Sequence, residues 1–200
     1  MKCFTIGNYY ENTYLINNGA DAILVDPGEK LYTILDELKL FNIKAILLTH
    51  GHIDHIDGIK HYLDVPIYLS SEELEVLESD DYTLYSTYNL NRPFDTNKLD
   101  FHFLSDNDSF NIAGLNIKMI FTPGHTKGSC CYLINEKLLM SGDTLFQVGI
   151  GRTDLPTGDM NKMLESLDKL KKLPDDTIVY PGHGVETTIG FEKVYNPYFK

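Results

Sequence analysis

The sequence of 200 residues contains no long uninterrupted run of apolar residues. A helix that crosses a membrane needs about 18 or more such residues in a row. Residues 1–8 also lack the continuous apolar stretch of a signal peptide. We therefore expect a cytoplasmic protein that does not associate with membranes.

Basic residues and cysteines are also few. The 17 Lys and Arg residues stand against 29 Asp and Glu, which gives a net charge of −12. No clustered Lys/Arg surface is visible, so a nucleic-acid partner is not expected. The chain has three cysteines, Cys3, Cys130 and Cys131. The adjacent pair would face opposite sides of a strand and could not bond to each other, which indicates reduced thiols.

No long linker rich in glycine, serine or charge divides the chain, so we expect residues 1–200 to form a single domain. Residues 79–100 differ from the rest because they are rich in Tyr and Asn and show little periodicity. An irregular segment of this length usually carries function or is mobile. We therefore predict that the 79–100 insertion lines the active site, and the alternative is a surface insertion packed on a sheet edge. The candidates for substrate contacts are Tyr82, Tyr85, Tyr88 and Arg92.

The regular elements can be predicted from apolar patterns. Strands are expected at 13–16 and 22–25, joined by a turn at 17–19. Helices are expected over Lys30–Leu40, Ile56–Leu63 and Asp159–Leu173. In the last of these, a buried stripe is predicted from Met160, Met163, Leu164, Leu167, Leu170 and Leu173.

Metal-ligand residues are concentrated in the segment His50-Gly51-His52-Ile53-Asp54-His55. It follows residues 44–49, an apolar run typical of a buried strand. Three imidazoles and a carboxylate without partners would be costly at the end of such a strand. Bound to a metal ion they are satisfied, and His and Asp are donors that suit zinc, iron or manganese.

Three further segments share one arrangement, in which a predicted strand is followed by a glycine turn and one donor residue. These donors are His125, Asp143 and His183. Glycine and proline allow tight turns that aim the next side chain out of the sheet end. Four strand ends that converge in this way predict a two-metal site. His61 and His102 lie outside the motifs, and we interpret them as exposed or otherwise satisfied side chains.

Together these motifs resemble the metallo-β-lactamase superfamily, and within it the small, single-domain bacterial hydrolases of the glyoxalase II-like (hydroxyacylglutathione hydrolase-like) group. The resemblance is carried by HxHxDH at 50–55 and by residues 142–146, 149–156 and 181–184, and it continues through 186–190, Glu192 and 196–198. It implies an α/β (α+β) fold, a four-layer αββα sandwich with the metal site at one edge between the two sheets.

Transferred to this sequence, the resemblance also implies a set of seven ligands for two divalent ions, with zinc favoured and iron or manganese as alternatives. The first ion would be bound by His50, His52 and His125. The second would be bound by Asp54, His55 and His183, with Asp143 as the bridge. Beside them, Asp26 could order a ligand loop and Arg152 could fix nearby carboxylates. For both residues an ordinary turn cap or ion pair is an equal alternative.

The implied reaction is hydrolysis of a small-molecule thioester of the S-acylglutathione type. Two close metals lower the pKa of a bridging water and polarise the substrate carbonyl, so a metal-activated hydroxide replaces a serine or cysteine nucleophile. Asp54 is the predicted catalytic residue, because its free oxygen could accept a hydrogen bond from that hydroxide. The acyl group, the thiol and the oligomeric state are left open.

Two other functions compete with this one. An iron-dependent persulfide dioxygenase of the same superfamily would use one histidine of the His50–His52 pair, His125 and Asp143, and it shares the Gly-Arg-Thr-Asp segment at 151–154. The continuation at 155–159 and the short ending favour the hydrolase. A metal-binding module without catalysis is a weaker alternative, since it needs no seven-ligand set. Because the chain ends soon after His183, we expect broad tolerance of the thiol.

Overall fold

The computed structural model describes residues 1–199, which form two six-stranded sheets that face each other. In both sheets, strands that are consecutive in the sequence are neighbours. The first sheet contains β1 (Lys2–Ile6), β2 (Glu11–Asn18), β3 (Asp21–Val25), β4 (Asn42–Leu47), β5 (Ile67–Ser70) and β6 (Phe101–Leu104). The second contains β7 (Ser109–Ile112), β8 (Leu115–Phe121), β9 (Cys130–Ile134), β10 (Leu138–Gly142), β11 (Ile178–Pro181) and β12 (Thr187–Thr188).

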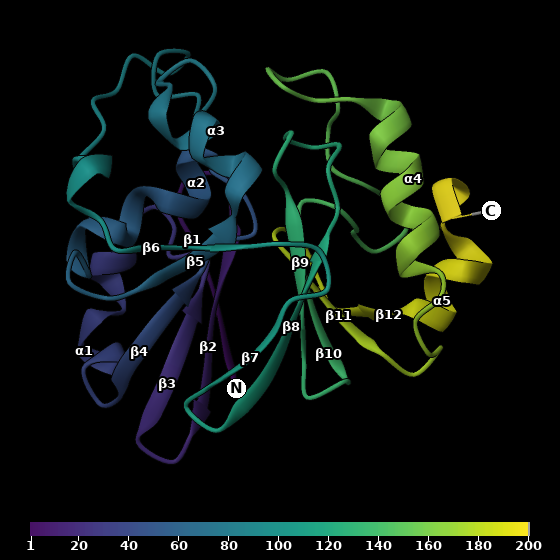
Figure 1. Cartoon of the computed structure of the whole chain (residues 1–200), viewed down its shortest axis with the longest axis horizontal. Helices are drawn as coiled ribbons and strands as arrows, with labels where there is room; N and C mark the ends of the chain where they lie inside the picture. Colours follow the sequence, from purple (N-terminus) through teal and green to yellow (C-terminus); the bar gives the residue numbers. More distant parts are fainter. Residues whose placement is uncertain (200) are drawn as a thin grey trace.

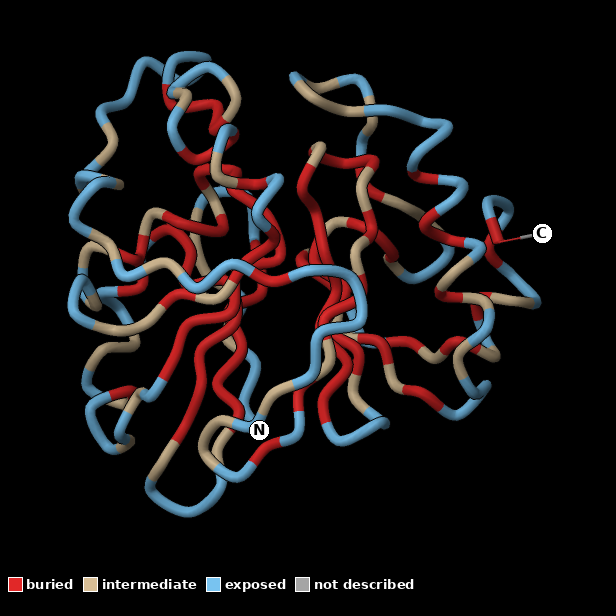
Figure 2. Tube along the Cα trace, viewed as in Figure 1, coloured by how far each residue is buried: buried red, intermediate tan, exposed pale blue. Residues whose placement is uncertain are grey.

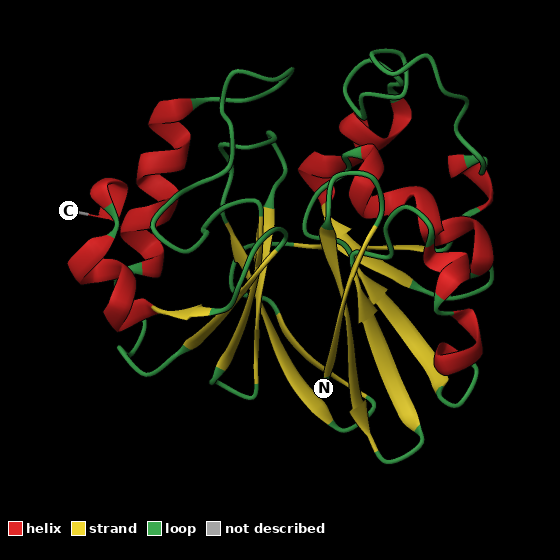
Figure 3. Ribbon diagram, turned by 180° about the vertical axis from the view of Figure 1, so that it is seen from behind, coloured by secondary structure: helices red, strands yellow, loops and turns green. Residues whose placement is uncertain are grey.

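Helices cover the outer face of each sheet, so the layers follow the order αββα (Figures 1 and 3). The first sheet carries α1 (Leu35–Leu38), α2 (Ile53–Ile56) and α3 (Leu74–Glu78). The second carries α4 (Met160–Leu170) and α5 (Ile189–Tyr195). Short 3₁₀ turns lie at Leu31–Thr33, Asp57–His61, Ser71–Glu73, Thr96–Lys98 and Pro197–Phe199. The predicted four-layer sandwich is confirmed.

The alternation of side chains along the strands creates three apolar layers. In β9, Cys130 and Tyr132 pack between the sheets, whereas Cys131 packs toward the residues under α4. The two thiols therefore face opposite sides of the strand, as predicted, and they are not bonded to each other. Figure 2 shows the result, with buried strands through the middle of the molecule and exposed loops at its periphery.

The strand directions place the metal-ligand segments at one edge. The predicted antiparallel pair β2 and β3 is confirmed, and β4 runs parallel to β3. In the second sheet, β8 and β10 are both antiparallel to β9, while β11 is parallel to β10. Thus β8, β10 and β11 share one direction, and the residues that follow them emerge at the same edge, as in open α/β sheets.

Two helix predictions need correction. The segment Lys30–Leu40 is not one helix but a 3₁₀ turn followed by α1, because the chain bends at Ile34 with φ −118° and ψ 4°. The bend lets Leu31 and Leu38 both reach the core. The helix predicted over Ile56–Leu63 begins earlier, with α2 at Ile53, and continues only as the 3₁₀ turn Asp57–His61.

The helix predicted over Asp159–Leu173 is present as α4, and Asp159 caps it by accepting hydrogen bonds from two backbone amides. Its predicted apolar stripe is only partly buried. Met163, Leu167 and Leu170 are fully buried. Met160 and Leu164 remain 41% and 42% exposed, because the sheet covers a narrower face of the helix than the apolar residues span.

Residues 79–100 form consecutive turns with one 3₁₀ turn and contain no strand or α-helix. The first part is nevertheless anchored, since Thr83 and Tyr85 are buried. The carbonyl of Thr83 accepts a hydrogen bond from Ile53 N at 2.9 Å, which connects this segment to the start of α2.

No helix in the described part of the chain is long and apolar enough to cross a membrane.

Candidate metal centre

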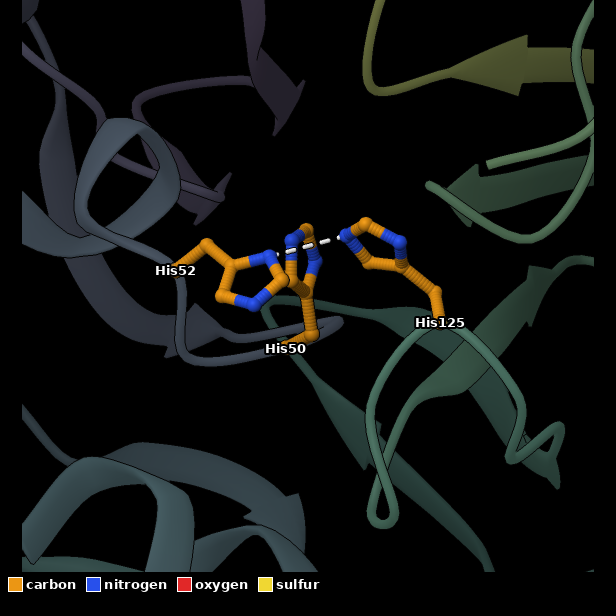
Figure 4. A group of neighbouring side chains, drawn as sticks. All are labelled: His50, His52 and His125. Atoms are coloured by element: carbon orange, nitrogen blue, oxygen red, sulfur yellow. Dashed lines mark hydrogen bonds between the residues drawn. The ribbon is translucent and has the colours of Figure 1, made fainter. Parts of the chain in front are cut away.

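The structure brings His50, His52 and His125 together into one group (Figure 4). His50 and His52 follow β4, whereas His125 follows β8 in the other sheet. The donor atoms of the group all lie within 4.8 Å of one another, and His52 Nδ1 is 2.8 Å from His125 Nε2. Three imidazole nitrogens that converge in this way can surround one ion.

A second group consists of Asp54, His55 and His183, whose donor atoms also lie within 4.8 Å of one another. Asp54 Oδ2 is 3.2 Å from His183 Nε2 and 3.8 Å from His55 Nε2. Asp143 lies between the two groups. Its Oδ2 is 3.5 Å from His125 Nε2, and its Oδ1 is 3.5 Å from His55 Nε2. The seven residues predicted from the sequence therefore lie together, with Asp143 in the position of a bridge.

Glycines permit this close approach of the two sheets. A Cβ on Gly142, which has φ +48°, would lie 2.2 Å from Thr49 Oγ1. A Cβ on Gly182 would lie 2.2 Å from Asp143 Oδ1. Because neither contact is sterically possible, glycine at these turns is required to place Asp143 beside the segment that follows β4.

Hydrogen bonds hold the imidazoles in orientation. His125 Nδ1 lies 2.7 Å from the carbonyl oxygen of Arg152, and His183 Nδ1 lies 3.1 Å from that of Tyr9. Bonds of this kind fix the tautomer of a metal-binding histidine and leave the other nitrogen free for the ion. The guanidinium of Arg152 pairs with Asp154 on the surface at 2.7 Å. The predicted contact of Arg152 is thus with Asp154, which is not a metal ligand.

Asp26 is a buried centre of hydrogen bonding beneath the site. Its Oδ1 accepts from Thr49 N at 2.8 Å, and its Oδ2 accepts from Thr49 Oγ1 at 2.6 Å. The same Oδ2 lies 3.1 Å from His55 Nδ1, and Thr49 Oγ1 lies 3.1 Å from His50 Nδ1. Asp26 therefore contacts the ligand loop in the manner expected from the sequence, and it orients one histidine of each group.

Glu73 was not predicted, although it joins two ligand loops. It is buried, and it accepts hydrogen bonds from Gly51 N and from Thr126 Oγ1, both at 2.7 Å. Burial raises the pKa of Glu73 to about 7, against the opposing effect of these hydrogen bonds. No motif marks this residue in the sequence, because its partners are far away along the chain.

The two groups differ in charge. Burial lowers the pKa of His50, His52 and His125, so these imidazoles are neutral, which is the form that binds metal. Burial acts in the same direction on His55, but Asp54, Asp143 and Asp26 outweigh it and raise the pKa of His55 to about 10. These three carboxylates thus favour a positive charge on His55, at the second group.

Several buried polar atoms of the site have no hydrogen-bond partner among the described residues. They include His50 Nε2 and Asp143 Oδ1. A buried polar atom without a partner is costly, and in native structures it usually indicates a missing ion or water. Neutral imidazoles together with carboxylates are a donor set that suits zinc, iron or manganese. The residues present therefore fit two divalent ions.

A cavity of about 320 Å³ opens above both groups. Its walls come from distant parts of the chain and include Tyr9, Leu84, Tyr88, Phe146, Ile150, Arg152 and Leu155. Tyr9 and Tyr88 face each other with ring centroids 5.2 Å apart. The sequence did not single out Tyr9, Leu84, Phe146, Ile150 or Leu155 as wall residues, because apolar and aromatic residues in a pocket wall have no distinguishing spacing.

Among the four candidates for substrate contacts, only Tyr88 lines this cavity. Tyr85 is fully buried, and its hydroxyl bonds to Asp57 at 3.2 Å. Arg92 pairs with Asp80 and does not line the cavity. Tyr82 is half-buried outside the cavity.

His61 and His102, the two histidines outside the motifs, lie away from the site and are exposed, as predicted. The ring of His102 stacks on Tyr68.

The fold and the ligand set are those of the metallo-beta-lactamase superfamily, whose family model matches residues 6–183, and the chain belongs to this superfamily. One relative is the hydroxyacylglutathione hydrolase GloC of Haemophilus influenzae, which is 37% identical over 99% of this chain and 97% of its own. Membership indicates a metal-dependent hydrolase.

Solved structures agree with the assignment. The B3 metallo-beta-lactamase BLEG-1 matches with a TM-score of 0.91 and 38% identity, over 100% of this chain and 99% of its own. TTHA1623, solved in a di-iron-bound form, matches with a TM-score of 0.85 and 32% identity, over 99% and 100%. ETHE1 from Myxococcus xanthus matches with a TM-score of 0.78 and 26% identity, over 98% and 82%.

Proposed function

We propose that this protein is a thioesterase that cleaves S-acylglutathione-type thioesters at a two-metal centre. The observation that carries the proposal is Asp143, whose carboxylate lies 3.5 Å from His125 Nε2 of the first group and 3.5 Å from His55 Nε2 of the second. Asp54, His55 and His183 form a second group of donors, and the seven donor residues together exceed what one tetrahedral ion uses. The similarity to GloC, a hydroxyacylglutathione hydrolase, supports the choice of substrate class.

The residues of the chain have distinct roles in this proposal. When bound, two divalent ions would polarise the thioester carbonyl and make hydroxide available near neutral pH. Asp54 is ionised, because His55 and His183 outweigh the effect of burial and lower its pKa. One of its oxygens can then hold a ligand position while the other accepts a hydrogen bond from the attacking water. Phe146, Ile150 and Leu155 would exclude bulk water from the acyl group.

Zinc and a cytoplasmic location belong to the same proposal. Five histidines and two carboxylates suit zinc, although the di-iron form of TTHA1623 makes iron the natural second choice. The described cysteines form no disulfide, which fits a reducing compartment.

The competing function is that of a persulfide dioxygenase, and the similarity to ETHE1 supports it. The test combines metal analysis of anaerobically purified protein with two assays, S-lactoylglutathione hydrolysis and oxygen uptake on glutathione persulfide. We expect close to two metal equivalents per chain and hydrolysis without oxygen uptake. One obligatory iron per chain, with oxygen consumed on the persulfide, would overturn the proposal.

A further inference from the structure

The loop at residues 146–150 forms one wall of the cavity. Phe146 and Ile150 both line it, only a few residues after the bridging Asp143. The ring of Phe146 also packs edge-on against His183, with ring centroids 6.1 Å apart. The shape of this loop therefore sets how a substrate would lie over the second ligand group.

The loop has a backbone conformation that its own sequence disfavours. Residues 146–149 form a tight turn, in which Phe146 N bonds to Gly149 O at 3.0 Å and Gly149 N bonds to Phe146 O at 3.3 Å. Inside the turn Val148 has φ +57°. Glycine or asparagine is usual at such a position, and a β-branched residue is strained there. Val148 is 46% exposed, so packing does not compensate for the strain.

Two fully buried side chains hold the turn in place, Glu192 in the middle of α5 and Asn196 directly after this helix. Glu192 Oε2 accepts a hydrogen bond from Val148 N at 2.9 Å. Asn196 Nδ2 donates to Gly149 O at 3.0 Å and to the same Glu192 oxygen at 2.9 Å. Thr187 Oγ1 donates to the other oxygen, Oε1, at 2.6 Å. Strained conformations persist where the surroundings over-determine them, and here Glu192 and Asn196 do so.

We propose that Glu192 and Asn196 are positioning residues that set substrate affinity by holding the 146–150 loop as a wall of the cavity. Neither residue lines the cavity or belongs to a ligand group. Their removal should let the turn relax and move Phe146 and Ile150 while the ligands stay in place. The kinetic part of the test rests on the proposed thioesterase function, whereas the structural part does not.

The structural part uses fluorescence. The chain contains no tryptophan, so Phe146→Trp introduces a single tryptophan into the cavity wall, and its emission can be excited selectively over that of the tyrosines. In the Phe146→Trp/Glu192→Ala protein we expect emission at longer wavelength and lower anisotropy than in Phe146→Trp alone. Adding Val148→Gly should reverse both changes, because glycine adopts positive φ without help. Unchanged emission after loss of Glu192 would overturn the proposal, even if the enzyme turned out not to cleave thioesters.

The kinetic part measures KM and kcat separately at full metal occupancy. We expect Glu192→Ala to raise KM by about 10- to 100-fold and to change kcat less. Small displacements of groups near a site have effects of this size. Val148→Gly in the Glu192→Ala background should recover most of the loss. Glu192→Gln should resemble the wild type, because its amide oxygen can still accept from Val148 N while its amide nitrogen donates to the Thr187 hydroxyl oxygen.

Controls separate positioning from general damage. Glu186→Gln changes the same residue type at an exposed position on the segment before α5 and should leave KM unchanged. If Glu192→Ala does not fold, Glu192→Asp replaces it in the test. The shorter side chain keeps the negative charge but no longer reaches Val148 N, so it should show the same rise in KM. An equal fall in kcat and metal content with KM unchanged, or no recovery on adding Val148→Gly, would contradict the proposal.

Discussion

The two ligand groups contain similar residue types, but they would hold their ions by different means. His50, His52 and His125 are at most 3% exposed and are neutral. The first group therefore offers an ion three uncharged nitrogen donors that are held by the surrounding protein. In the second group the side chains of Asp54 and His183 are 15% and 26% exposed, and carboxylates raise the pKa of both histidines, His55 and His183. Geometry would thus determine the affinity for the first ion, and charge that for the second.

The difference between the two ligand groups should be lost most completely when Asp143 is removed. Asp143→Ala takes away the carboxylate that lies between a histidine of the first group and a histidine of the second. We expect a loss of thioesterase activity of about a thousandfold, or about 4 kcal/mol of transition-state stabilisation, together with weaker binding of both ions. Steady-state kinetics and metal analysis on the same sample measure these effects. A variant that kept two ions and most of its activity would show that Asp143 is not shared.

Asp54→Asn tests the catalytic role separately from binding. The amide keeps one oxygen donor but removes the negative charge and one acceptor. We expect kcat to fall by about a hundredfold, within the range typical of general base groups, while more metal is retained than in Asp143→Ala. Wild-type turnover in this variant would refute the role proposed for Asp54.

His183→Ala should affect the second group alone. His183 is the most exposed histidine of the site, and its loss leaves His50, His52 and His125 intact. We expect the metal content to fall from about two equivalents toward one, with activity lower by about 10- to 100-fold. Metal analysis after dialysis measures this. Equal loss of both ions would mean that the groups cannot be separated.

Glu73→Ala is the corresponding test of the first group, since Glu73 ties the loop of His50 and His52 to the loop of His125. We expect the affinity for the first ion to fall by about tenfold, the lower end of the effect of outer hydrogen-bond partners. Glu73→Gln should recover most of it, because Gln can still accept from Gly51 N. Competition with a chromophoric chelator gives the two affinities. A loss confined to the second ion would contradict the assignment.

The smallest expected effect is a difference in proton release. The histidines of the first group are neutral at pH 7, so the first ion should displace no proton. The pKa of His55 is raised to about 10, so His55 is protonated at pH 7 and the second ion should release about one proton or more. Its affinity should therefore rise with pH until about pH 10 is passed. Calorimetry in two buffers of different ionisation enthalpy measures the count. Equal release by both ions would remove the distinction between the groups.

The metal-ligand residues could be predicted from the sequence because they are concentrated in short motifs. The segment at 50–55 and the three glycine turns predicted which donors meet, because strand ends of one direction share a sheet edge. The same reasoning could not find Glu73 or the role of Glu192, because a buried carboxylate of this kind is identified by its backbone amide donors, which are distant in the sequence. It also could not tell which side chains of the 79–100 segment face the cavity: Tyr88 does, whereas Tyr85 and Arg92 are engaged by Asp57 and Asp80.

The ligands also divide between the two halves of the fold, and this has a mechanical consequence. Residues 50–55 extend from the first sheet, whereas His125, Asp143 and His183 extend from the second. Bound ions would therefore act as cross-links that fasten the sandwich along one edge. Ligands that bind only the folded state stabilise it by mass action. A chelator should accordingly lower the melting temperature as well as stop turnover, and the halves should begin to part at the edge where catalysis takes place.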